Sequence, residues 1–94
     1  RNTAYFVERM KAAGFDIKPT ESAICAVMLY DAKVAQEMAA RLLDEGIYVI
    51  GFYYPVVPKE QARIRVQISA AHETAHLDAC IKAFTQVAKQ MNIL

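Results

Sequence analysis

The sequence predicts an α/β protein, in detail an α+β two-layer sandwich in which helices cover one face of a three-stranded, mainly antiparallel sheet. Three observations predict it. Apolar residues recur at helical spacing in three segments, and in three other segments they run continuously or alternate with a period of two. The segments follow the order helix, strand, helix, strand, strand, helix. A loop joins the last two strands, so we expect them to pair antiparallel, with the third strand lying between the first two.

Three segments carry the helical pattern. The first, residues 3–13, ends before a glycine. The second, residues 32–45, follows Asp31, whose carboxylate can cap the first turn, and precedes Gly46, which can take the left-handed conformation that ends a helix. The third begins at residue 73 or 74 and runs to about residue 91. Each has an apolar stripe suited to covering a sheet.

The strands are expected at residues 23–29, 47–52 and 62–69. The last of these alternates strictly: small and branched apolar residues occupy the even positions, and the odd positions hold Arg63, Arg65, Gln67 and Ser69. Residues 18–22 form a turn-rich link by composition, and residues 53–61, with two prolines, form a loop. Since the helices would cover the apolar face of the last strand, its arginine face stays open.

Two arginines on an open sheet face have two explanations. They are ordinary solvated charges, or one of them lines a cleft against a domain that lies outside this sequence. In the second case the planar, two-pronged donor set of arginine suits a carboxylate or a phosphate. The apolar neighbours, with Tyr53, Tyr54 and the proline-containing loop nearby in the sequence, favour a binding site.

Composition excludes several classes of function. The 94 residues hold 11 basic and 10 acidic side chains, a net charge of +1, so we expect no nucleic-acid partner. The longest apolar run, residues 47–57, is too short for a bilayer, which needs about 20 residues, so we expect no membrane association. The 55% hydrophobic content is high for a small domain, and the sequence begins at Arg1 without a methionine. We therefore expect a piece of a longer protein.

We expect no metal centre from the cysteines and histidines. Cys25 and Cys80 lie in apolar segments without paired spacing, and we expect both to be buried free thiols, which suits a cytoplasmic or mitochondrial-matrix location. His72, Glu73 and His76 match the H-E-x-x-H pattern of zinc peptidases. We expect no metal there, because His72 falls at or before the helix start and the two rings need not share a face.

Residues 46–72 carry a family resemblance. The segment G-F-Y-Y-P-V-V-P-K at 51–59, the R-x-R strand and His72 resemble the C-terminal part of the α-oxoamine synthases, which are pyridoxal-phosphate enzymes of the aspartate aminotransferase fold. The likeness extends over the whole chain and is greatest to the glycine C-acetyltransferases, for which the 51–59 segment is fairly specific. One departure is Glu60, where the family usually has glycine.

The resemblance implies a division of roles. The chain, residues 1–94, would be the C-terminal small domain of a fold-type-I pyridoxal-phosphate enzyme, and the catalytic and cofactor-binding residues would lie in a large domain outside it. Lys59 is therefore not the cofactor lysine. The family's substrate-carboxylate arginine is the second of the R-x-R strand, which is Arg65 here. The whole enzyme would condense glycine with acetyl-CoA and form a homodimer.

Two alternatives stay open. Another α-oxoamine synthase would use a different acyl-CoA or amino acid on the same scaffold. A non-enzymatic, ferredoxin-like binding module would have the same order of elements without any catalytic partner domain.

Overall fold

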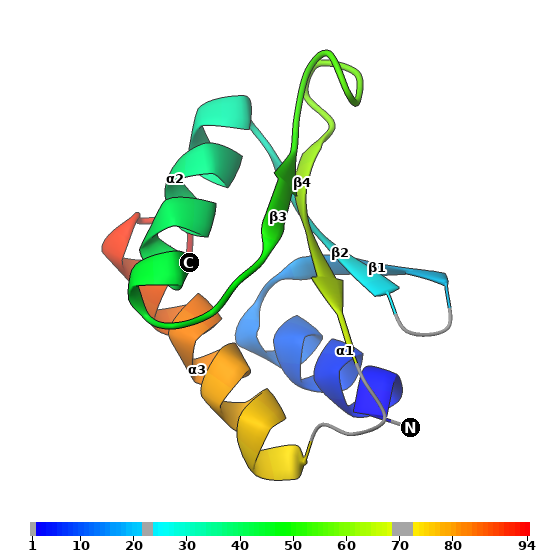
Figure 1. Ribbon diagram of the computed structural model, residues 1–94, viewed down its shortest axis with the longest axis vertical. Helices are drawn as coiled ribbons and strands as arrows, with labels where there is room; N and C mark the ends of the chain where they lie inside the picture. The colour runs from blue at the N-terminus through cyan, green and yellow to red at the C-terminus, as the bar shows by residue number, and fades with distance from the viewer. Residues whose placement is uncertain (1, 22–23, 69–72) are drawn as a thin grey trace.

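The computed structural model describes residues 2–21, 24–68 and 73–94. They form three helices and four strands: α1 (Asn2–Ala13), β1 (Asp16–Glu21), β2 (Ile24–Tyr30), α2 (Ala32–Asp44), β3 (Ile50–Phe52), β4 (Ala62–Gln67) and α3 (Thr74–Gln90). The strands make one sheet in the order β1-β2-β4-β3, with every neighbouring pair antiparallel. Figure 1 shows the helices gathered against this sheet in a second layer. The predicted two-layer fold is confirmed, with one strand more than expected.

The extra strand is β1. The prediction of a link at residues 18–22 was wrong for residues 18–21, which belong to a strand that pairs with β2. A proline lacks the N–H that a central strand needs, but β1 is an edge strand, where one side makes no ladder. The register shifts between Pro19 and Glu21, as expected where a proline interrupts the pairing.

The remaining elements follow the prediction closely. Asp31 caps α2, with its side chain accepting hydrogen bonds from the backbone N–H groups of Lys33 and Val34. Gly46 has φ +86, the left-handed conformation expected after the helix. The strand expected at 47–52 is shorter, because only Ile50–Phe52 pairs with β4. The central position of β4, between β2 and β3, is as predicted.

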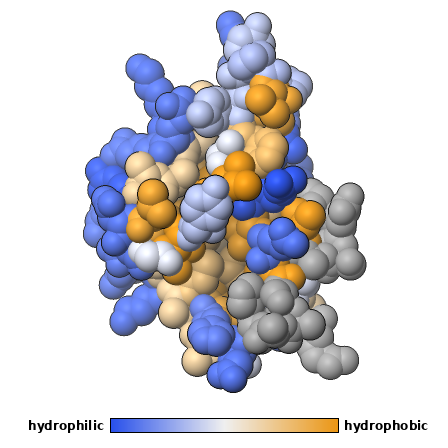
Figure 2. Space-filling model, viewed as in Figure 1, coloured by the Kyte–Doolittle hydropathy of each residue, from blue (hydrophilic) through white to orange (hydrophobic). Residues whose placement is uncertain are grey.

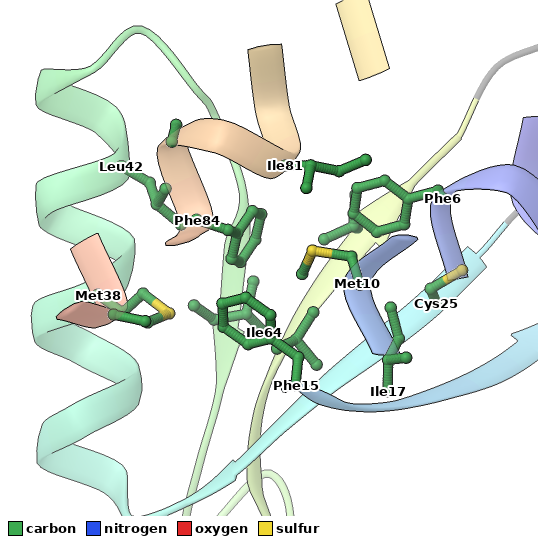
Figure 3. Close-up of a cluster of buried hydrophobic side chains, with 14 of the residues drawn as sticks. Phe6, Met10, Phe15, Ile17, Cys25, Met38, Leu42, Ile64, Ile81 and Phe84 are labelled. Atoms are coloured by element: carbon green, nitrogen blue, oxygen red, sulfur yellow. The ribbon is translucent and has the colours of Figure 1, made fainter. Parts of the chain in front are cut away.

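The core lies between the sheet and the helices. Phe84 of α3 is fully buried, with edge-to-face contacts to Phe6 and Phe15 at ring-centroid distances of 6.5 Å and 5.9 Å. Figure 3 shows these residues and Ile64 of β4 within one cluster of buried hydrophobic side chains. Cys25 is buried here as predicted, but Cys80 is only half-buried, so the prediction of two buried thiols was correct for one.

The sheet has one covered face and one without a helix. On β4 the side chains of Ala62, Ile64 and Val66 are buried, whereas Arg63 is half-buried and Arg65 and Gln67 are exposed. This alternation places the helices on the apolar face, as the sequence predicted. The opposite face is the one that presents the arginines.

Candidate functional site

Arg65 occupies the middle of the open face. It lies in β4, directly opposite Ala26 of β2 on one side and Ile50 of β3 on the other. The side chain is exposed, and both flanking residues are apolar. The strict alternation of β4 fixes this direction, because shifting the register by one residue would bury the arginine and expose the core.

The guanidinium of Arg65 rests on an aromatic ring. Its central carbon lies 4.8 Å from the ring centroid of Phe52, a half-buried residue of β3. Among the described residues, none makes a hydrogen bond or an ion pair with the Arg65 guanidinium. The Phe52 ring thus contacts the face of the guanidinium, and this contact leaves the N–H donors of Arg65 available to an anion.

Arg63 is arranged differently, although it lies on the same face. It is half-buried, and its Nε donates a hydrogen bond of 2.9 Å to the backbone carbonyl oxygen of Gln61. One of its donors is therefore used within the chain, at the start of β4. Of the two arginines, Arg65 is better prepared to bind an external carboxylate.

A cleft of about 600 Å³ adjoins Arg65. It is lined by residues 46–50, which lead into β3, by residues 65–67 of β4 and by the first turns of α3. The cleft forms because β3 pairs with β4 only as far as Arg65, and the chain before Ile50 runs apart from the sheet. Figure 2 shows apolar surface over the middle of this side of the molecule. A charged group at the rim of a mostly apolar cleft suits a small ligand with one anionic end.

The polar residues of α3 in the cleft are not prepared for catalysis. Burial raises the pKa of the Cys80 thiol to about 11, so it is protonated at neutral pH and a weak nucleophile. His76 accepts a hydrogen bond of 3.2 Å at Nδ1 from the backbone N–H of Glu73, as part of a capping box at the helix start. His76 therefore stabilises the start of α3.

The structure describes only part of the H-E-x-x-H match. His72 lies outside the described residues. Within residues 2–21, 24–68 and 73–94, no group of three or more His, Cys, Asp or Glu side chains could hold a metal ion. In the same part of the chain, no helix has the length and apolar character needed to cross a membrane.

The lysines do not fit the role of an anchor for pyridoxal phosphate. All six are exposed, and none of them lines the cleft. Lys59, the lysine of the proline-containing loop, lies with its Nζ 5.1 Å from the ring centroid of Tyr54. Pyridoxal phosphate that is bound as a Schiff base needs a lysine inside the cofactor site. None of these six lysines has that placement.

Arg65 is a candidate that the sequence already indicated, whereas Phe52 and the contribution of α3 appear only in the structure. The loop tyrosines, Tyr53 and Tyr54, do not line the cleft, and Figure 1 shows the loop at the far end of the β3–β4 hairpin. The signal for Phe52 was its spacing of two from Ile50, which places both on one face of β3. Its alignment with the arginines required the register of the hairpin.

Comparison with known proteins agrees with this architecture. The chain is 52% identical over 93 residues to the 2-amino-3-ketobutyrate coenzyme A ligase of Escherichia coli K12, covering 99% of this chain and 23% of that protein. It is 42% identical to the 8-amino-7-oxononanoate synthase of Thermoanaerobacter pseudethanolicus, covering 99% of this chain and 24% of the relative. A solved serine palmitoyltransferase variant from S. paucimobilis, with a bound PLP–myriocin aldimine, superposes with a TM-score of 0.88 at 32% identity, covering 99% and 24%.

The fold is therefore that of a segment of fold-type-I pyridoxal-phosphate enzymes. The chain belongs to the class I and II aminotransferase family, whose model matches residues 1–84. The resemblance of the sequence to the 2-amino-3-ketobutyrate coenzyme A ligases is confirmed. The chain spans about a quarter of the length of these relatives.

Proposed function

We propose that this chain is the C-terminal small domain of a pyridoxal-phosphate-dependent acyltransferase that condenses glycine with acetyl-CoA to 2-amino-3-ketobutyrate and free CoA. The observation that carries the proposal is Arg65. It lies on the open face with no hydrogen-bond partner for its guanidinium among the described residues, at the R-x-R position, in a chain 52% identical to 2-amino-3-ketobutyrate coenzyme A ligase. The cofactor would be held by the large domain outside this chain, where it would supply the electron sink for the reaction.

Arg65 would bind the carboxylate of glycine. Two parallel N–H···O bonds from one guanidinium fix both the place and the plane of a carboxylate. Fixing that plane sets which bond at the glycine Cα is aligned for cleavage. We propose that Arg65 thereby favours loss of the Cα proton over loss of CO₂.

The overall reaction balances without a further reagent. A bond forms between the glycine Cα and the acetyl carbonyl carbon, and the thioester C–S bond breaks. The Cα proton leaves, and the sulfur departs as the CoA thiol. In the reverse direction the same enzyme would use the CoA thiol to cleave 2-amino-3-ketobutyrate to glycine and acetyl-CoA, in the breakdown of threonine.

A second α-oxoamine synthase activity is the alternative. The observation in its favour is the 42% identity to 8-amino-7-oxononanoate synthase. The 52% identity to the ligase is higher and favours the first proposal. The acyl-CoA would then differ, while Arg65 would still bind an amino-acid carboxylate.

The test uses the full-length protein. CoA release is measured with glycine or alanine as amino acid and with acetyl-CoA or longer acyl-CoA thioesters. We expect the highest kcat/KM with glycine and acetyl-CoA. A preference for a longer thioester would favour the alternative, and no release with any pair would refute the enzyme assignment.

A further inference from the structure

We propose that Phe52 is a positioning residue for Arg65, an aromatic platform that sets the plane of its guanidinium for the incoming carboxylate. The inference rests on the proposed function and names a second residue of the same site. Phe52 lies directly opposite Arg63, so it is the diagonal neighbour of Arg65 on the adjacent strand. Diagonal neighbours on one sheet face are within reach of long and aromatic side chains.

The geometry of the contact is that of a cation–π pair. The guanidinium carbon of Arg65 lies 4.8 Å from the ring centroid of Phe52, inside the distance of about 6 Å at which a ring face attracts a cation. Phe52 is half-buried in a paired strand, which limits its own motion. The ring therefore offers a fixed surface beside a long, exposed side chain.

A contact with the face of the guanidinium restrains arginine and leaves its N–H donors free to bind an anion. The N–H groups of a guanidinium point outward in its plane, so a ring against its face occupies none of them. A hydrogen bond would instead consume a donor, as Gln61 does at Arg63. Holding the plane in advance reduces the conformational entropy lost when the carboxylate binds.

The same hairpin supplies a matched control. Lys59 and Tyr54 form a second cation–π pair at 5.1 Å in the loop between β3 and β4. Neither residue lines the cleft. Removing this ring tests whether the loss of an aromatic contact in the hairpin is enough to disturb the site.

The experiment measures the full-length protein with each substrate varied in turn, and glycine binding by calorimetry. Phe52→Leu should raise the glycine KM and its dissociation constant about three- to tenfold, leaving the acetyl-CoA KM within about twofold. Phe52→Tyr keeps the ring face and should retain wild-type binding. Tyr54→Leu should change neither KM. Phe52→Met provides a side chain of similar volume if the leucine variant does not fold.

A double substitution separates positioning from packing. In the Arg65→Ala background, Phe52→Leu should cause no further loss of glycine binding, because its target is gone. An equal loss in both backgrounds, or an equal rise of both KM values, would overturn the inference. If Arg65→Ala lowers glycine affinity but Phe52→Leu does not, this inference fails alone. If Arg65→Ala leaves glycine affinity unchanged, the proposed function of Arg65 fails.

Discussion

The Nε of Arg63 donates a hydrogen bond of 2.9 Å to the backbone carbonyl oxygen of Gln61, where the loop after β3 enters β4. This bond ties the side chain to the base of the hairpin. Arg65, two residues further along the same face, rests on Phe52 instead. Two arginines that look equivalent in the sequence therefore have different surroundings, and we expect different consequences when each is removed.

The first prediction compares the two arginines in the full-length enzyme. Arg65→Ala should weaken glycine binding by about 2–5 kcal/mol, with little effect on acetyl-CoA, because only the amino acid carries the bound carboxylate. Arg65→Lys should recover part of this, since an ammonium lacks the planar fork. Arg63→Ala should instead lower the free energy of unfolding by about 1 kcal/mol, the net value of one hydrogen bond. Steady-state kinetics and denaturation of both variants give the comparison, and the reverse pattern would show that the arginines were assigned the wrong way round.

The second prediction concerns the cofactor. The isolated chain should have no acetyltransferase activity and should bind no pyridoxal phosphate as an imine, because all six lysines are exposed and none lines the cleft. The visible spectrum is recorded during titration, followed by borohydride reduction and peptide mapping. Circular dichroism first establishes that the chain is folded. Stoichiometric labelling of one lysine would contradict the assignment of the cofactor site to the rest of the protein.

The third prediction is that the isolated chain self-associates. Several large apolar side chains are exposed near the open face and its hairpin: Tyr48 at 79%, Val56 at 73% and Ile50 at 41%. Figure 2 shows apolar and polar side chains interspersed on the side of the molecule that it presents. Exposed apolar patches of several hundred Å² usually mark a contact. Sedimentation at increasing concentration should show mass growth, together with binding of a hydrophobic dye; an ideal monomer that binds no dye would argue against a missing neighbour.

Local patterns predicted most of the fold. The alternation of β4 identified its two faces, and Asp31 and Gly46 marked the ends of α2, because capping depends on neighbouring residues only. Strand β1 was missed because Pro19 is a turn signal in the sequence. Only its edge position in the completed sheet makes it acceptable there.

The site was predicted less completely than the fold. Arg65 was proposed from the family resemblance and from its expected place on the open face. Phe52 was not, since its contact depends on the pairing of Phe52 with Arg63 across a loop of nine residues, 53–61. The contribution of Cys80 and His76 to the cleft depends on the packing of α3 beside the sheet. Such contacts between distant segments follow from tertiary packing and carry no local signal.

The fourth prediction concerns Glu60, which stands where the resembling family usually has glycine. The structure gives Glu60 a φ of +64, in the left-handed region that side chains with a Cβ disfavour by about 1–2 kcal/mol. Glycine relieves this strain but adds freedom to the unfolded chain, so Glu60→Gly should raise the free energy of unfolding by about 0.5–1 kcal/mol. Glu60→Ala removes the same charge and keeps the Cβ, so it should bring no comparable gain. Denaturant unfolding of the three proteins under one condition makes the comparison. Equal stabilisation by alanine and glycine would point to the charge of Glu60 instead of its backbone conformation. A loss of stability with glycine would show that the loop does not hold residue 60 in the left-handed region.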